Sequence, residues 1–356
     1  MRVITVILAA ALLLASCNSG SPDSTSGKKS TGSVSLTAAG ATFPLPFYNL
    51  AIKNYSDKTG LAVTYGGVGS GGGIRSLKDR VVDFGATDAY LNADQEAEMP
   101  AEIVHIPTCI GAVVIAYNLP GIEGLKLSNE NLQDIFMGRI TNWNDERIRV
   151  TNPDLELPDQ ALTVVHRSDG SGTTFIFSDF MSKISPDWES AVGRGKSLQW
   201  PTGIGAKGNP GVAGTISTTT GAVGYIGSEY AFAQKISFAQ IENSAGNYVR
   251  PSLESISAAA QGELPADTRV MLTCSADPGA YPISGFTWLI LYKEQDYNNR
   301  SEAQAEATVQ FLSWIIETDA QALAQQVHYA PLPAAAVANA RKILGSVVYD
   351  GQPLLK

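Results

Sequence analysis

The sequence has few cysteines, few histidines and few charged residues. Its 356 residues include three cysteines and three histidines, and only 17% are charged while 44% are hydrophobic. A disulfide-dense scaffold is excluded, and His105, His166 and His328 show no metal-ligand spacing, so neither a metal nor another cofactor is indicated. The formal net charge is −9 without any lysine or arginine block, so no nucleic-acid partner is expected. The length and the high hydrophobic content fit one very large globular domain or two medium ones.

Two cysteines, Cys109 and Cys274, lie outside the N-terminal segment. An exported chain would permit a bridge between them. Each stands beside apolar residues, which slightly favours two separately buried thiols, and the sequence leaves both alternatives open.

The N-terminus lacks an apolar run long enough to cross a membrane. Arg2 is followed by roughly eleven apolar residues, whereas a spanning helix needs about 20, so residues 1–16 are predicted to be a secretory signal peptide. The segment "LASC" resembles the bacterial lipobox, which implies a lipid anchor on Cys17; a plain signal peptide with an incidental cysteine is the alternative. Residues 17–34 are rich in Ser, Gly and Lys and predict a flexible tether. The chain is therefore expected to be exported and anchored to a membrane, in the periplasm or at the cell surface.

Short apolar runs bounded by Gly, Pro and Asn alternate with helical patterns, which predicts an α/β fold. Strands are expected over 61–68, 81–88, 106–119 and 161–168. Helical spacing joins several sets of apolar residues: Ile74, Leu77 and Val81; Phe177, Phe180, Met181 and Ile184; and Ala307, Phe311, Trp314 and Ile315. Polar, proline-bearing stretches suggest one lobe of residues 35–116 plus 285–356 and a second lobe of residues 117–284.

Three predicted helix starts carry groups that could hold an anion, and the first follows "AAGATF". Thr42 and Phe43 precede Pro44, and proline is favoured in the first helical turn. Thr42 could therefore offer its hydroxyl and nearby free backbone N–H groups to a ligand. The alternative is that Thr42 simply caps the helix.

The second start is the glycine-rich "GGVGSGGGI", in which Ser70 is the one side chain able to donate. Gly67, Gly69 and Gly72 match G-x-G-x-x-G, and Asp88 follows at about the distance at which a dinucleotide fold needs its ribose-binding acid. A lone match is weak, and export counts against a nicotinamide cofactor.

The third start is "HRSDGSGTT". Arg167 offers a planar fork of donors suited to an oxyanion, and Asp169 could hold that fork in place. Ser171, Gly172 and Thr173 lead into the next helix. The alternatives are a surface ion pair between Arg167 and Asp169 and a capping role for Ser171.

These segments carry a family resemblance. "AGATFPLPFY", "GGVGSGGGI", "VDFGATDA", "HRSDGSGTTFIF", "GIGAKGNPGVAG" and "GAVGYIGSEYA" stand in the order and spacing of the phosphate-binding proteins of bacterial phosphate ABC transporters, the PstS family. The resemblance implies a two-lobed periplasmic-binding-protein fold, type II-like, with hinged lobes around a ligand cleft. It implies a monomer that is not an enzyme and that delivers inorganic phosphate to membrane permease and ATPase subunits. The implied phosphate ligands are Thr42, Phe43, Ser70, Asp88, Arg167, Ser171, Gly172 and Thr173, with Asp169 orienting Arg167.

Asp88 is the unexpected member of this set, because a carboxylate repels an anion. Phosphate near neutral pH still bears a proton that a carboxylate can accept, whereas sulfate has none, so Asp88 is predicted to discriminate between them. Another oxyanion as the ligand, or a sensing role, remains an alternative. A phosphoryl-transfer hydrolase built on Ser171, with His166 and Asp169 or Asp88, is the weaker alternative because Ser171 lies outside any G-x-S-x-G motif.

Overall fold

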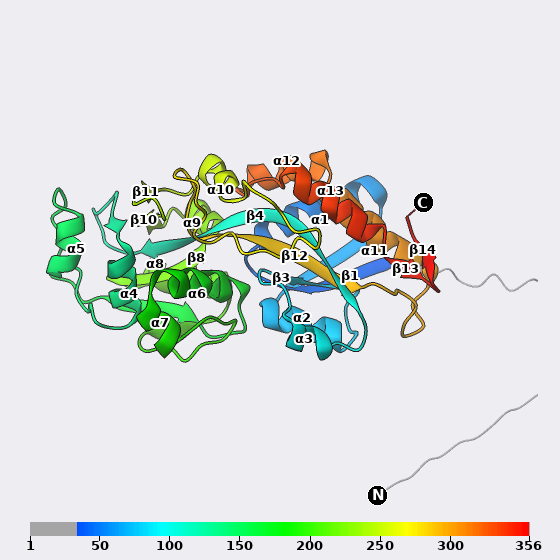
Figure 1. Cartoon of the computed structure of the whole chain (residues 1–356), viewed down its shortest axis with the longest axis horizontal. Helices are drawn as coiled ribbons and strands as arrows, with labels where there is room; N and C mark the ends of the chain where they lie inside the picture. Colours follow the sequence, from blue (N-terminus) through cyan, green and yellow to red (C-terminus); the bar gives the residue numbers. More distant parts are fainter. Residues whose placement is uncertain (1–33, 356) are drawn as a thin grey trace, which may run out of the picture. The chain divides into compact units, whose positions relative to one another are not determined.

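One long strand joins two half-sheets in the computed structural model, which describes residues 34–355 (Figure 1). β4 (Ile103–Tyr117) pairs with β12 over residues 103–112 and with β8 over residues 113–117. We call the strands on the β12 side the first half-sheet and those on the β8 side the second half-sheet. The first half-sheet also contains β1 (Ser35–Gly40), β2 (Ala62–Gly67), β3 (Phe84–Thr87) and β12 (Ser284–Tyr292). The second also contains β6 (Thr163–Arg167), β7 (Ile204–Ala206), β8 (Ala222–Gly227) and β9 (Ser237–Phe238).

Each half-sheet contains three parallel strands. The order is β2-β1-β3-β12-β4 in the first half-sheet and β4-β8-β6-β7 in the second, and β9 pairs with β4. β1, β2 and β3 are parallel, as are β6, β7 and β8, whereas β4 and β12 run antiparallel to their neighbours. Parallel neighbours cannot be joined by tight turns, and a helix follows each of these strands along the chain.

The helices cover the faces of the two half-sheets (Figure 1). In the first half-sheet, α1 follows β1 and α2 follows β2. In the second half-sheet, α6, α8 and α9 follow β6, β7 and β8, respectively. The helices within residues 34–355 are α1 (Leu45–Thr59), α2 (Ser70–Lys78), α3 (Ala93–Ala97), α4 (Asn129–Phe136), α5 (Glu146–Thr151), α6 (Gly172–Ile184), α7 (Pro186–Ala191), α8 (Gly208–Thr218), α9 (Ser228–Gln234), α10 (Leu253–Ala259), α11 (Glu302–Ile315), α12 (Thr318–Gln326) and α13 (Ala334–Leu344).

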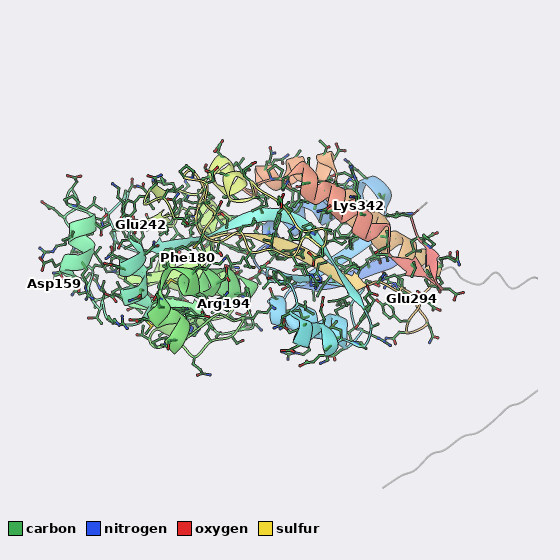
Figure 2. All side chains as sticks on the ribbon, in the orientation of Figure 1. Asp159, Phe180, Arg194, Glu242, Glu294 and Lys342 are labelled. Carbon is green, nitrogen blue, oxygen red and sulfur yellow. The ribbon has the colours of Figure 1, made fainter. Side chains whose placement is uncertain are left out.

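The core follows the central strands. Every residue of β4 and β12 is buried, which explains why both segments read as continuous apolar runs and not as alternating patterns. Side chains fill the space between sheet and helices, with Phe180 buried under the second half-sheet while Asp159, Arg194 and Lys342 lie on the outside (Figure 2). Two small sheets complete the fold, made of β5 (Lys126–Leu127), β10 (Gln240–Glu242) and β11 (Tyr248–Val249), and of β13 (Val348–Tyr349) and β14 (Gln352–Pro353).

The predicted strands are confirmed as β2, β3, β4 and β6, and the two later helical patterns as α6 and α11. The assignment of Val81 to a helical face is wrong. α2 ends at Lys78, and Arg80 adopts a φ of 56°, so the chain turns away and leaves Val81 67% exposed. Ile74 and Leu77 do face the interior, in a small cluster beneath β12.

Cys109 and Cys274 are free thiols, so they form no disulfide with one another. Cys109 is fully buried, whereas Cys274 is only partly buried. No helix within residues 34–355 has the length and apolar character needed to cross a bilayer. The predicted signal peptide and the lipidation site at Cys17 lie outside the described residues, and the lobe boundaries remain predictions.

Candidate functional site

The predicted site residues follow the carboxyl ends of the parallel strands of both half-sheets. Thr42 comes just after β1, Ser70 after β2 and Asp88 immediately after β3. Arg167 is the last residue of β6, and Ser171 begins the turn into α6. Because the carboxyl ends of parallel strands share one edge of a sheet, each half-sheet gathers its own polar residues at one place. Hydrogen bonds described below connect the two groups.

Thr42 does not cap α1, although that was one alternative from the sequence. The N-cap position is Pro44, which makes no side-chain cap bond. The Thr42 hydroxyl instead accepts hydrogen bonds from the backbone N–H and the side-chain amide of Asn209, each at 3.1 Å. Thr42 and Asn209 belong to different half-sheets, and both are buried. The interaction therefore connects the start of α1 with the start of α8.

Phe43 is held by its backbone and by its ring. Its carbonyl accepts a hydrogen bond from the Tyr329 hydroxyl. Its buried ring lies over Gly111 on β4, where a Cβ atom would come within 2.4 Å of the ring. These contacts fix the backbone between Thr42 and α1.

Ser70 forms a second connection between the half-sheets. Its hydroxyl accepts from the backbone N–H of Gly172, at 3.0 Å, and from the backbone N–H of Asp88, at 3.3 Å. A Cβ atom on Gly172 would lie 2.5 Å from both Ser70 Oγ and Asp88 Oδ2, so only glycine permits this approach. Nearby, the backbone N–H of Gly71 donates to the carbonyl of Gly170 at 2.9 Å.

Asp88 lies at the centre of these contacts and is 1% exposed. The Thr287 hydroxyl donates to Oδ1 at 2.7 Å, and Ser70 Oγ lies 3.4 Å from Oδ2. Burial raises the pKa of this carboxyl to about 7, against the opposing effects of the Thr287 hydrogen bond and the Arg167 charge. A buried carboxyl with a raised pKa is a candidate functional group.

Arg167 and Asp169 form a buried two-pronged ion pair, so the alternative of a surface pair is wrong. Arg167 Nε lies 2.7 Å from Oδ1 and Nη2 lies 2.6 Å from Oδ2 of Asp169. The two side chains are 1% and 13% exposed. Burial alone would raise the pKa of Asp169, but hydrogen bonds and the Arg167 charge outweigh it and lower the pKa. Asp169 thus fixes the guanidinium, whose Nη1 donates to the Thr173 hydroxyl at 3.4 Å.

Ser171 does cap α6, as one alternative held, since its hydroxyl accepts from the N–H of Thr174 at 3.0 Å. Ser171, Gly172 and Thr173 are all buried. A helix N-terminus presents free N–H groups and a partial positive charge. All eight predicted ligands, and Asp169, are therefore gathered at one buried location.

Sequence reasoning missed three residues that belong to this location. Asn209 donates to Thr42 and, at 3.0 Å, to the Thr173 hydroxyl, while its own Oδ1 accepts from the N–H of Gly227. A signal existed for Asn209, because it precedes a proline at a helix start in the same way as Thr42 does. Thr287 and the partly buried Lys196 gave no comparable local signal.

Lys196 is a cation near Asp88 that carries no partner carboxylate within ion-pair distance among the described residues. Its ammonium donates to the Gln95 amide oxygen at 3.2 Å and lies over the Phe175 ring at 5.6 Å. Burial lowers the pKa of Lys196 to about 8, although the Asp88 charge acts to raise it. This group would therefore add positive charge to the site near neutral pH.

The residues of the hydrolase alternative are not arranged for catalysis. His166 stacks on Trp200 with ring centroids 4.7 Å apart, and its Nδ1 lies 3.1 Å from the Arg167 carbonyl oxygen. The Ser171 hydroxyl contacts Thr174. A nucleophile needs a base within hydrogen-bond reach, and this contact is not present between Ser171 and His166 in residues 34–355.

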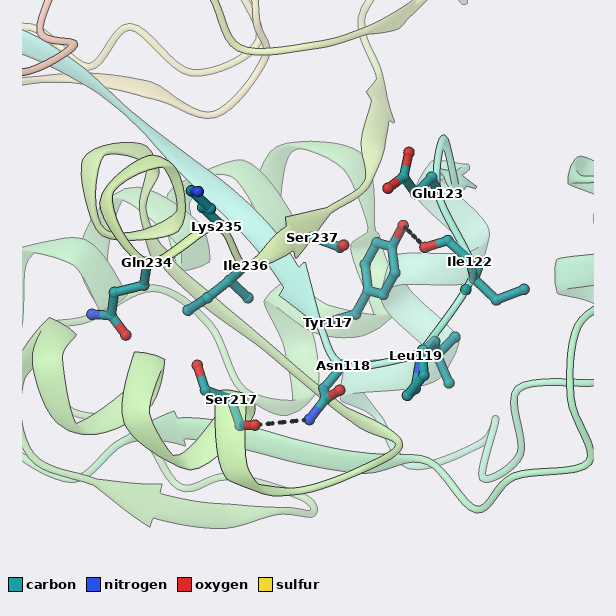
Figure 3. A pocket seen from close by; sticks show the side chains of 12 residues that line it. Tyr117, Asn118, Leu119, Ile122, Glu123, Ser217, Gln234, Lys235, Ile236 and Ser237 are labelled. Carbon is teal, nitrogen blue, oxygen red and sulfur yellow. Dashed lines mark hydrogen bonds between the residues drawn. The ribbon is translucent and has the colours of Figure 1, made fainter.

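A surface pocket of about 320 Å³ lies elsewhere, between the end of β4 and α9 (Figure 3). Its lining includes Tyr117, Asn118, Ser217 and Lys235, and none of the eight predicted ligands. Lys235 is the one basic side chain in this lining. The pocket therefore lacks the convergence of donors seen at Asp88.

The fold and this junction of two polar groups define a two-lobed binding protein of the mixed α/β class. Comparison with known proteins agrees: the model of the PBP superfamily domain matches residues 24–319. The phosphate-binding protein PstS of Xylella fastidiosa is 40% identical over 321 residues, covering 89% of this chain and 85% of that protein. The chain belongs to the PstS family of phosphate-binding proteins within the PBP superfamily.

Solved structures agree on the fold. A high-affinity periplasmic phosphate-binding protein bound with phosphate matches with a TM-score of 0.68 and 22% identity, covering 86% of this chain and 93% of that one. An ABC-type phosphate transport receptor from Vibrio cholerae matches with a TM-score of 0.53 and 21% identity, covering 84% of this chain and 100% of that one. The curated relatives carry the name phosphate-binding protein.

Proposed function

We propose that this protein binds one inorganic phosphate between its lobes, outside the cytoplasmic membrane, and delivers it to an ABC-type importer. The observation that supports this most directly is the meeting of Ser70, Asp88 and Gly172. The hydroxyls of Ser70 and Thr287 reach the Asp88 carboxylate, and the Gly172 N–H from the other half-sheet donates to the Ser70 hydroxyl. Phosphate is the tetrahedral oxyanion that brings both acceptors and a proton at neutral pH.

The proposed ligands other than Asp88 divide into neutral donors and one cation. The neutral donors are Thr42, Ser70, Ser171 and Thr173 with the backbone N–H groups of Phe43 and Gly172, and the cation is Arg167. Desolvating a dianion is costly unless every oxygen is compensated. Because Asp169 already matches the Arg167 charge, helix N-termini at about +0.5 each and short hydrogen bonds must supply much of the compensation. Lys196 is a further source of positive charge.

Asp88 is proposed to select the ligand. Its carboxylate can accept the proton of hydrogen phosphate, whereas sulfate would place an unprotonated oxygen against it. A site built around one such hydrogen bond can reject the wrong ligand by about 10⁴–10⁵-fold. Phosphate is therefore favoured over sulfate as the ligand.

The first experiment is titration calorimetry of the protein after unfolding, dialysis and refolding to remove bound anions. Phosphate and sulfate are titrated in parallel at pH 7.5. We expect phosphate to bind at least a thousandfold more tightly than sulfate, on the order of the discrimination available to such a site. Comparable heats from both anions would contradict the role of Asp88, and heat from neither would contradict anion binding itself.

Transport and location form the second part of the proposal. Lobes of residues 35–116 plus 285–356 and of residues 117–284 would close on the ligand, and the monomer would dock on permease and ATPase subunits. Residues 1–16 would be removed as a signal peptide, and Cys17 would carry the lipid anchor. Radiolabelled palmitate incorporation, compared between the wild type and Cys17→Ser, tests the anchor, and equal labelling would contradict it.

We further propose that the protein has no catalytic activity. The arrangement of His166 and Ser171 supports this. Incubation with a chromogenic phosphate monoester tests it, and sustained turnover that tracks with the purified protein would overturn the proposal.

A further inference from the structure

Thr287 stands opposite Asp88 in the first half-sheet. β12 and β3 are antiparallel with Trp288 opposite Thr87, so the next pair along the ladder is Thr287 and Asp88. Residues directly opposite one another on antiparallel strands present their side chains on the same face. Thr287 is fully buried, and its Oγ1 lies 2.7 Å from Asp88 Oδ1.

A β-bulge occurs at the same point on the other side of β12. Thr287 pairs with Cys109 of β4, but Trp288 pairs with Pro107, so Thr108 is an extra residue. Bulges change the local twist and redirect side chains, and they are common beside functional sites. The Thr108 hydroxyl donates to the Thr287 carbonyl at 3.3 Å, which holds the bulge and β12 together.

The hydrogen-bond partners of Thr287 determine the direction of its proton. Its hydroxyl lies within reach of Asp88 Oδ1, at 2.7 Å, and of the Thr87 carbonyl, at 3.4 Å. A carbonyl and an ionised carboxylate only accept, so Thr287 must donate, and the shorter distance selects Asp88. Oδ1 is thereby engaged, while Oδ2 faces Ser70 Oγ and the N-terminus of α6.

We propose that Thr287 is a positioning residue for ligand selection: its hydroxyl holds Asp88 by Oδ1 and presents Oδ2 as the atom that accepts the proton of hydrogen phosphate. This inference rests on the proposed function. Donation to the ionised carboxylate stabilises the accepting form over the protonated form. Thr287 need not touch the ligand, since it acts through Asp88.

A pH measurement separates this role from simple packing. Protonated Asp88 can donate to sulfate, so sulfate affinity should rise as the pH falls through the titration of Asp88. Loss of the Thr287 hydrogen bond should move that midpoint to higher pH. Other charged or ionisable groups interact with the Asp88 charge and are the same residues in every variant, so a titration such as that of Lys196, whose pKa is about 8, affects all variants alike: Arg167, Lys196, Glu229, Cys109, Tyr48, Tyr65 and Tyr230.

The test compares Thr287→Val, Thr287→Ser and the wild type by calorimetry with phosphate and sulfate from pH 5 to 8.5. We expect Thr287→Val to lower the phosphate-to-sulfate affinity ratio about tenfold or more, as for loss of one hydrogen bond to a charged group. Thr287→Ser keeps the hydroxyl and should stay within about threefold of the wild type. Ser284→Ala is the matched control, because it removes a buried hydroxyl of the same strand that donates to the Tyr281 carbonyl and not to Asp88, and it should leave the ratio unchanged.

Two outcomes would overturn the inference while leaving phosphate binding intact. One is a Val variant with the wild-type ratio and the wild-type pH midpoint. The other is an equal loss of affinity for both anions, which would show that Thr287 serves only packing. Thr287→Ala also lacks the hydroxyl and has a smaller side chain, so it should give the same result as Thr287→Val. It is the variant to use if Thr287→Val does not fold. Failure of the wild type to bind phosphate would refute the proposed function instead.

Discussion

The two half-sheets contribute charged residues of opposite sign to one location, and only one of these charges has a partner of opposite charge. The first contributes Asp88, a buried carboxyl whose nearest partners are the neutral hydroxyls of Ser70 and Thr287. The second contributes Arg167, whose charge is already matched by Asp169. An unpaired acid is sensitive to whether a ligand brings a proton, whereas a paired arginine is a fixed donor. The comparison suggests a test: the unpaired acid of the first half-sheet should affect selectivity, and the paired arginine of the second should affect affinity.

The largest expected effect is on selectivity, through Asp88→Asn. An amide can donate to sulfate, so the preference for phosphate should fall from the order of 10⁴ to within about tenfold of parity, while phosphate affinity itself changes less. Parallel calorimetric titrations measure the ratio. Thr42→Val and Ser171→Ala are controls from each half, and both should lower affinity for the two anions alike. Retained selectivity in Asp88→Asn would remove the contrast between the lobes.

Arg167→Met should have the next largest effect, and on affinity. It removes the donor fork and leaves Asp169 buried and unpaired, which costs about 3–5 kcal/mol of folding free energy. Phosphate affinity should fall about a hundredfold, with little change in selectivity. Denaturant unfolding measures the folding free energy, and calorimetry measures the phosphate affinity. The double variant Arg167→Met/Asp169→Asn should recover stability but not affinity, and recovery of both would show that Arg167 acts only through the ion pair.

The third expectation concerns stability and pH in phosphate-free buffer. The Asp88 pKa is raised to about 7 in the folded protein, so the folded state holds this proton more tightly than the unfolded state does. The resulting stabilisation is complete below about pH 4 and is lost as the pH rises to about 7, by at most about 4 kcal/mol. Asp88→Asn cannot titrate, so its stability relative to the wild type should increase over that range. A difference that does not vary with pH would contradict the raised pKa.

The smallest expected effect is that of Lys196→Met. Because the ammonium is partly buried near Asp88 and bonded to Gln95, its loss should weaken phosphate binding less than about tenfold. The loss should be greatest at low salt and below about pH 8, where the wild-type lysine is protonated. Gln95→Ala is the matched control, because it removes the hydrogen bond to Lys196 while leaving the lysine charge in place. A loss that is independent of both salt and pH would indicate packing and not charge.

Local sequence patterns predicted the strands and the helix starts well, because each of those depends on neighbours along the chain. Thr42, Ser70 and Ser171 were found from proline, glycine and hydroxyl residues at predicted helix starts. Thr287 could not be found in this way, since its role depends on the register between β12, β3 and β4, segments far apart in sequence. Val81 was misplaced because the end of α2 depends on one left-handed residue, Arg80.

The alternative of a surface ion pair, which the sequence left open beside an orienting role for Asp169, could not be excluded locally for a related reason. Arg167 and Asp169 are two positions apart on a segment with mixed polarity, which is typical of a solvent-facing turn. Their burial arises because loops from both half-sheets cover them, and the N–H of Gly208 donates to Asp169 at 3.0 Å. The burial of these two side chains therefore depends on contacts between segments far apart in sequence, which local sequence patterns do not reveal.

The contact between Gly71 and Gly170 has one further consequence. Two peptide groups meet there without any side chain between them, joined by a single hydrogen bond of 2.9 Å. Both glycines are partly exposed, and such a bond is worth about 1 kcal/mol in net terms, so this contact adds little resistance to separation of the two loops. The buried hydrogen bonds from Gly172 to Ser70 and from Asn209 to Thr42 therefore contribute more of the connection between the half-sheets.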